Sequence, residues 1–139
     1  MNIRIKRDCS NINWTEVKNI LKTVGMSYVD EELHKKSFEN SYTVVFVFDE
    51  ERLIGFGRAI SDGIRQSAIY DIAILPEYQG LGIGKLIIEN IISNTPTCNF
   101  ILYASPGKEG FYEALGFSKL KTGMGLFINT ERMKSRNFI

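Results

Sequence analysis

The sequence has few of the residues from which metal centres and covalent active sites are built. It contains two cysteines, Cys9 and Cys98, and one histidine, His34, among its 139 residues. Neither cysteine has a second cysteine or a histidine at metal-ligand spacing, so we expect no metal site. A Ser–His or Cys–His catalytic pair is not expected either. We expect both cysteines to be small buried apolar side chains without a disulfide.

Long apolar runs and an excess of one charge are also missing. No apolar stretch reaches the roughly 18–20 residues that span a bilayer. The first residues, MNIRIKRD, place charges where a signal peptide needs an apolar core. The 17 Lys and Arg nearly balance the 16 Asp and Glu, which leaves a formal charge of +1 and no basic footprint for nucleic acid or an anionic membrane. We therefore expect a soluble cytoplasmic protein without nucleic-acid or membrane partners.

What is present is the composition of a folded domain. Hydrophobic residues make up 44% and prolines number only 3, which excludes a disordered or low-complexity chain. With no repeat or linker, residues 1–139 are predicted to form one mixed α/β domain. Apolar periodicity predicts strands at 2–6, 42–48, 53–60, 67–75 and 98–103, and helices at 14–24, 30–39, 82–94 and 108–115.

Two further features of the sequence concern the second helix and the end of the chain. The second helix has a narrow apolar face, mainly Leu33 and Phe38. The end of the chain is predicted to form a hairpin from strands at 117–121 and 124–128, turning at Thr122 and Gly123. The last ten residues are polar, and we expect no regular structure there.

The strongest chemical signal is a glycine-rich turn between a strand and a helix. Gly80, Gly82 and Gly84 follow the strand residues Ile72–Leu75 and open the third helix. Glycine has no Cβ, so an anionic group can approach the backbone closely, and the free N–H groups of a helix start suit a phosphate. The spacing fits neither a P-loop nor a dinucleotide fingerprint, because the glycines are two and two apart. On this loop alone, a turn without a ligand is an equal alternative.

A second motif favours a ligand-binding loop over a turn without a ligand. The segment Gln79-Gly80-Leu81-Gly82-Ile83-Gly84 resembles the Gln/Arg-x-x-Gly-x-Gly/Ala signature of the GNAT-type N-acetyltransferase superfamily. Residues 111–117, FYEALGF, resemble that family's F-Y-x-x-x-G-F helix ending at the usual distance, and the order of elements agrees along nearly the whole chain. The resemblance implies a single-domain GNAT fold, with a mixed, mostly antiparallel sheet, a splayed parallel pair of strands and flanking helices.

The resemblance also implies how acetyl-CoA is bound, in a cleft between the splayed strands and without a metal. The main chain of the strand end is then expected to pair with the pantetheine amides, and the glycine loop to hold the pyrophosphate. Lys85 adds a charge contact or is simply a solvated helix lysine. Ser105 stands where many members carry Asn, which changes that contact to the cofactor. The cofactor-binding residues implied are Ile72, Ala73, Ile74, Gln79, Gly80, Leu81, Gly82, Ile83, Gly84, Lys85 and Ser105.

Catalytic roles follow from the same resemblance. Tyr112 matches the family's usual general acid, which protonates the departing thiolate, although a packed aromatic side chain is the alternative. The N–H of Ile74 is placed to stabilise the negative charge on the acetyl oxygen. Asp71, a carboxylate in an otherwise apolar strand, is either the base for the amine or the ion-pair partner of Arg58. Arg58 and Tyr28 are the candidates for contact with the acceptor.

The predicted function is transfer of an acetyl group from acetyl-CoA to a primary amine of a small molecule or peptide, by direct attack in a ternary complex. No covalent cysteine intermediate is implied. The alternatives are a non-catalytic acyl-CoA-binding sensor or interaction protein and, disfavoured by the spacing, nucleotide binding by the loop. A homodimer is compatible with the sequence but is not indicated by it.

Overall fold

The computed structural model describes all residues from Met1 to Ile139, and the chain divides into two compact units, Met1–Leu102 and Tyr103–Ile139. The strands are β1 (Ile3–Lys6), β2 (Thr43–Asp49), β3 (Arg52–Ser61), β4 (Gln66–Ile74) and β5 (Asn99–Ile101). The helices are α1 (Trp14–Thr23), α2 (Glu31–Glu39), the short 3₁₀ helix η1 (Pro76–Tyr78), α3 (Ile83–Asn94), α4 (Glu109–Ala114) and α5 (Thr130–Ser135). No helix is both long and apolar enough to cross a membrane.

The first unit is built on one five-stranded sheet in the order β1-β2-β3-β4-β5. The first four strands pair antiparallel with their neighbours, and β4 and β5 pair in parallel. Short turns join β2, β3 and β4, whereas the parallel step needs the crossover through α3, as parallel strands require. The predicted mixed, mostly antiparallel α/β sheet is therefore confirmed.

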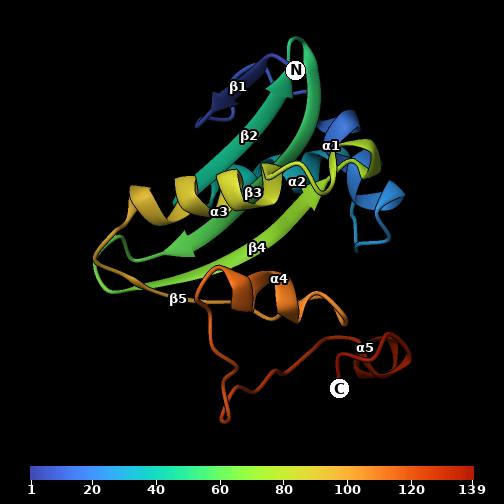
Figure 1. The fold of residues 1–139 in the computed structure, drawn as a ribbon. Helices are drawn as coiled ribbons and strands as arrows, with labels where there is room; N and C mark the ends of the chain where they lie inside the picture. Colours follow the sequence, from blue (N-terminus) through green and yellow to red (C-terminus); the bar gives the residue numbers. More distant parts are fainter. The chain divides into compact units, whose positions relative to one another are not determined.

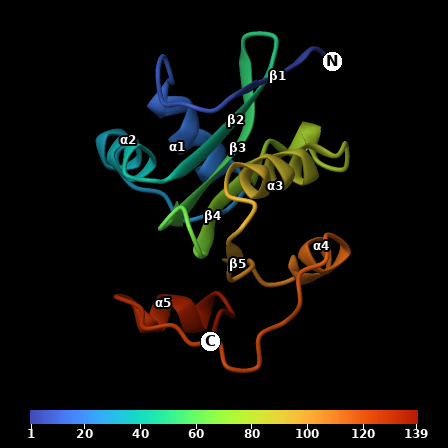
Figure 2. The same ribbon diagram turned by 90° about the vertical axis from the view of Figure 1, so that its left-hand side faces the viewer.

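Helices cover both faces of this sheet (Figures 1 and 2). Figure 2 shows α1 and α2 on one side of the strands and α3 on the other. The predicted start of α1 is confirmed, because the Asn13 side chain accepts hydrogen bonds from the N–H groups of Thr15 and Glu16. Gly25, with φ +78°, follows its end.

Strand β2 is buried on both faces, which explains its nearly continuous apolar sequence. Phe46 points toward α1 and α2, where its ring contacts Trp14 and Phe38. Val45 and Val47, which alternate with it, are fully buried as well. On the α3 side, a Cβ at Gly57 would lie 2.9 Å from the side chain of Ile87, so the glycine lets α3 approach the sheet closely.

Some local predictions were wrong. Leu33 is 50% exposed, and the buried face of α2 consists of His34 and Phe38. The apolar pattern did not include His34 in the buried face, because histidine counts as a polar residue although its ring is largely apolar. Strand β5 is shorter than the predicted 98–103. Both cysteines are free as predicted, but they are half-buried rather than buried.

The second unit differs most from its prediction. No hairpin forms over residues 117–128, and the last residues contain the helix α5, whose N-cap Asn129 accepts from the Arg132 N–H. Met124, Leu126 and Ile128 alternate as a strand would, yet each is at least 98% exposed. An isolated two-stranded hairpin is marginal in water, so alternation alone does not form one.

Candidate active site

The end of β4 is an open sheet edge. Strand β5 pairs only with residues 66–68 of β4, so residues 69–74 have no strand beside them on that side. Within this stretch the register to β3 shifts, since Phe56 faces Ala73 and Arg58 faces Tyr70. Asp71 and its neighbour Ile72 therefore oppose Gly57 alone. This is a β-bulge, which bends the strand away from regular pairing.

Main-chain groups at this edge alternate in direction. The N–H of Leu75 donates to the carbonyl of Ile54 on β3 (2.9 Å), so the main chain of Ile74 faces the open edge instead. There the Gln79 side-chain amide donates to the Ile74 carbonyl (2.9 Å). The carbonyl of Ala73 lies against Gly55 of β3. Of the three predicted strand contacts, Ile74 thus presents its polar groups to the open side, and Ile72 lies within the bulge.

The glycine loop leads from this edge into α3. Gly80 and Gly82 have φ of +77° and +84°, and a Cβ built on either would meet no atom within 4 Å. Gly82 caps α3 without any side-chain hydrogen bond to the helix. The first N–H groups of α3 therefore have neither an intrahelical acceptor nor a capping side chain, and the positive end of the helix dipole lies there.

The other loop residues have distinct surroundings. Leu81 is 53% exposed, whereas Ile83 is buried in the core beneath α3. Gly84 is half-buried in the first turn. The Lys85 ammonium lies 3.7 Å from the Glu89 carboxylate one turn later, and both are exposed, so this pair is worth little.

The structure brings two predicted residues together, Arg58 on β3 and Asp71 on β4. Arg58 Nε donates to Asp71 Oδ2 at 2.7 Å, and the two side chains retain only 15% and 22% of their exposure. The guanidinium lies over the rings of Phe38 and Tyr70, 5.6 and 5.4 Å from their centroids. Asp71 has φ +57°, in the left-handed region that residues other than glycine rarely adopt. We call this arrangement the Arg58–Asp71 pair.

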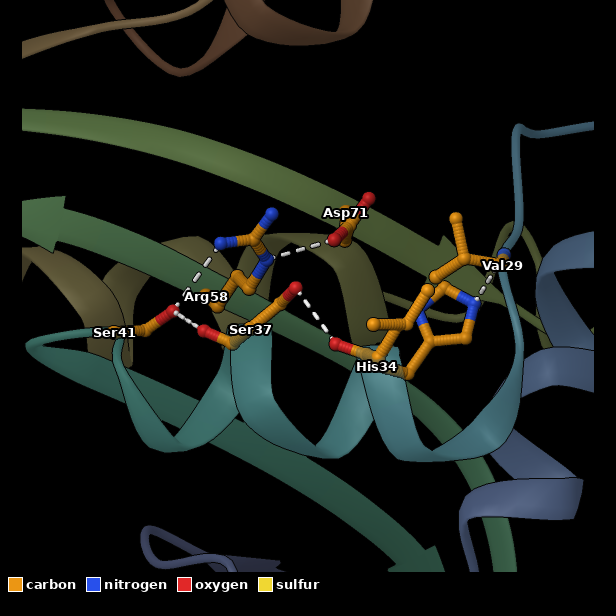
Figure 3. A network of polar contacts seen from close by, with 7 residues as sticks. Val29, His34, Ser37, Ser41, Arg58 and Asp71 are labelled. Carbon is orange, nitrogen blue, oxygen red and sulfur yellow. Dashed lines mark hydrogen bonds and ion pairs between the residues drawn. The ribbon is translucent and has the colours of Figure 1, made fainter.

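A polar network links the pair to α2 (Figure 3). Arg58 Nη1 donates to Ser41 Oγ (3.2 Å), which itself donates to the Ser37 carbonyl (2.7 Å). Further along α2, His34 Nε2 accepts the N–H of Val29 (2.9 Å) in the loop before the helix. Sequence reasoning missed Ser41 and His34. Neither belongs to a motif, and only the packing of α2 on the sheet shows their roles.

The environment of His34 fixes its protonation. Its ring is 5% exposed, and burial, the largest cause, lowers its pKa below the usual 6.5. A neutral ring whose Nε2 accepts from Val29 carries its proton on Nδ1. His34 therefore holds the α1–α2 loop to α2. In that loop Tyr28 is 44% exposed, with the ammonium groups of Lys18 and Lys22 about 6 Å from its ring centroid.

Tyr112 and Ser105 lie in the second unit. Tyr112 is half-buried on α4, and its ring meets those of Phe111 and Phe117 edge-on, with centroids 4.9 and 5.7 Å away. Burial raises the pKa of its hydroxyl above the usual 10. Ser105 is half-buried in the loop before α4, where its carbonyl accepts the Lys108 N–H (2.9 Å).

The open edge and the glycine loop fit acetyl-CoA. A row of main-chain polar groups on the free side of β4 matches the amides of a pantetheine arm, and the uncapped start of α3 matches a pyrophosphate. No group of three or more His, Cys, Asp and Glu side chains lies close enough together to hold a metal ion.

Comparison with known proteins decides the family. Residues 11–124 match the model of the acetyltransferase (GNAT) domain. The chain belongs to the GNAT acetyltransferase family. The family resemblance predicted from the two motifs is thereby confirmed.

Relatives and solved structures agree with this assignment. The chain is 28% identical to GCN5-related N-acetyltransferase 1, chloroplastic, of Arabidopsis thaliana, over 94% of this chain and 70% of the plant protein. It is 29% identical to serotonin N-acetyltransferase 2, chloroplastic, of rice, over 82% of this chain and 60% of that protein. A Staphylococcus aureus structure described as a probable acetyltransferase superposes with a TM-score of 0.77 at 30% identity, over 91% of this chain and 99% of that one. The GNAT fold is thus confirmed.

Proposed function

We propose that this GNAT protein transfers the acetyl group of acetyl-CoA to the primary amine of a small molecule or peptide, by direct attack in a ternary complex. The observation that carries the proposal is the open edge of β4, which runs into a glycine loop and the uncapped start of α3. Both features expose main-chain polar groups, of which the Ile74 carbonyl already accepts from the Gln79 side chain. Family membership makes acetyl-CoA the group that fits them.

The cofactor contacts follow from these exposed groups. The N–H groups of residues 81–85 are the donors for the pyrophosphate, and the main chain of Ile72 and Ile74 is the partner of the pantetheine arm. The acetyl thioester supplies the activated acyl group. The Ile74 N–H faces the open edge and is the proposed donor to the negative charge that develops on the acetyl oxygen.

Tyr112 is the proposed acid. A phenol with a pKa raised by burial stays protonated throughout the physiological range and is available to protonate a departing thiolate.

Asp71 is the proposed base. One oxygen is held by Arg58, and Figure 3 shows the second carboxylate oxygen directed away from the guanidinium. An amine arrives mostly protonated, so a carboxylate beside the strand end is suited to orient it and take up its proton, directly or through water. The ion pair with Arg58 is present as the sequence suggested, and it fixes the carboxylate without occupying both oxygens.

The acceptor belongs to the class of primary amines. The rice relative is named for serotonin, a small primary amine, which supports this class without specifying the molecule. A cytoplasmic location stays a prediction, since the names of two plant relatives say chloroplastic.

An amine panel tests the proposal. Acetyl-CoA is expected to raise the melting temperature, and one or more primary amines to cause release of free CoA thiol. Stabilisation by acetyl-CoA without thiol release from any amine would favour the alternative, a non-catalytic acyl-CoA-binding protein. Stabilisation by ATP in place of CoA would contradict both and favour a nucleotide site.

A further inference from the structure

Two polar groups of the Arg58–Asp71 pair have no partner in the protein. Arg58 uses Nε and Nη1 for Asp71 and Ser41, which leaves Nη2 without an acceptor. Asp71 uses Oδ2, which leaves Oδ1 without a donor. Figure 3 shows the remaining nitrogen and the remaining oxygen on the same side of the pair, directed away from α2. A donor and an acceptor thus stand next to each other, both available.

These two groups are held rigidly. The guanidinium is fixed by two hydrogen bonds and by the rings of Phe38 and Tyr70. Asp71 is fixed in a left-handed backbone conformation within the bulge. Strain of this kind persists only where the surroundings impose it, and it is frequent at ligand sites. A donor whose direction is already fixed loses little entropy when it binds, which favours recognition over a freely moving surface charge.

The pair also lies beside the proposed site of reaction. Asp71 directly precedes Ile72, the first residue of the strand end that faces the open edge. Its side chain and that of Arg58 keep 22% and 15% of their surface accessible, enough for a contact with a small group. The pair carries no net charge, whereas a lone carboxylate would attract positive charge. A second positive charge on the acceptor would therefore lie near the guanidinium without a net attraction to the pair.

We infer that the Arg58–Asp71 pair recognises an amine that carries a carbonyl oxygen on the adjacent carbon, as in an α-amino acid amide or a peptide amino terminus. The inference rests on the proposed function and narrows its acceptor. The amine donates to Asp71 Oδ1, and the carbonyl oxygen accepts from Arg58 Nη2. A diamine is disfavoured because its second ammonium is repelled by Arg58. A simple alkylamine leaves the Nη2 donor unsatisfied.

The test compares alaninamide with isopropylamine, which lacks the carbonyl group. Steady-state kcat/KM is measured for both amines with the wild type and with Arg58→Gln. The ratio of the two values in the variant is divided by the same ratio in the wild type, so the intrinsic reactivity of each amine cancels. We expect this preference for alaninamide to fall about tenfold, the effect of losing one charge-assisted hydrogen bond.

The control is Arg4→Gln. Arg4 also lies over an aromatic ring, that of Phe48 at 4.4 Å, but on the outer strand β1. It should leave the preference unchanged within about twofold. If kcat/KM falls by the same factor for both amines in Arg58→Gln, Arg58 only supports Asp71. That result would overturn the inference and leave the proposed function intact. Thiol release from no amine at all would instead contradict the proposed function, and the inference with it.

Three further measurements use the wild type and need no variant at position 58. In the wild type, putrescine should be acetylated at least about tenfold less efficiently than butylamine, and a reversed order would overturn the inference. The values of kcat/KM for alaninamide and for an alanine tripeptide distinguish the two sources of this chemistry, and acetylation of neither would overturn the inference. In nitrogen NMR spectra, the Arg58 side-chain signals should shift with alaninamide and not with isopropylamine. Identical spectra with both amines would contradict the contact to Nη2.

Discussion

Twelve hydrophobic residues in the range 1–102 are less than 2% exposed, whereas no residue in 103–139 is buried. The first unit has a sheet covered on both faces, and the second has two short helices joined by extended chain. Yet the proposed reaction draws on both, because the glycine loop lies in the first unit and Tyr112 in the second. The residues that stabilise the fold and those proposed for the chemistry therefore lie partly in different parts of the chain.

The largest difference is expected when one phenylalanine is truncated in each unit. Phe46→Ala removes a fully buried ring that contacts Trp14, Phe38 and Phe56, and should lower the free energy of unfolding by about 3–5 kcal/mol. Phe127→Ala removes a half-buried ring that contacts Tyr103, and should cost less than about 1 kcal/mol. Denaturant unfolding of both variants measures this. Equal losses would contradict the contrast between the units.

The second unit should matter for turnover instead. Tyr112→Phe removes the proposed proton donor but keeps the ring and its contacts with Phe111 and Phe117. We expect kcat to fall about 100-fold or more, with little change in acetyl-CoA affinity and in stability. Tyr103→Phe, in the same unit, is the matched control and should retain its turnover. An unchanged kcat in Tyr112→Phe would exclude the acid role.

Within the first unit, substitutions at two glycines distinguish the effect of backbone strain on stability from an effect on cofactor binding. Gly82 and Gly25 both have positive φ, +84° and +78°, with open space at the Cβ position. Alanine at either should cost about 1–2 kcal/mol of stability. Only Gly82→Ala should also weaken acetyl-CoA binding, by about tenfold, because its Cβ occupies the approach to the helix start. Calorimetric titration measures the acetyl-CoA affinity of both variants. Equal affinities would show that the glycine loop does not contact the cofactor.

The smallest effect concerns His34 and pH. Burial lowers the pKa of this histidine in the folded protein, so the unfolded chain binds the additional proton first. Stability should therefore decline as the pH falls below about 6.5, by at most about 1.4 kcal/mol per pH unit. His34→Gln does not titrate and should show a shallower decline between pH 7 and 5. Parallel profiles for the two proteins would show that His34 does not contribute.

Much of the first unit followed from the sequence. The apolar sequences of β2 and β3 and the glycines before α3 each report a local constraint that the fold then satisfies. The ion pair of Asp71 with Arg58 was one of two alternatives that the sequence left open, because a carboxylate in an apolar strand needs a partner or a function. The bulge and the left-handed Asp71 did not follow, since register depends on how β3 and β4 meet.

The failures have physical reasons as well. His34 was read as polar and Leu33 as core, although the packing of α2 on the sheet decides which side turns inward. In the second unit, the alternation of Met124, Leu126 and Ile128 predicted a strand, but strand formation needs a partner as well as a pattern. Local periodicity is thus informative where a core supports it, and less so in residues 103–139.

The most direct test of the account follows the acetyl group itself. The wild-type protein is incubated with acetyl-CoA labelled in the acetyl carbons and with alaninamide, and the products are analysed by mass spectrometry. We expect the label in an amide on the alaninamide nitrogen, with one free CoA thiol released per amide formed and no acetylated protein intermediate. Release of CoA with the label in free acetate, or no release with any amine of the panel, would contradict it.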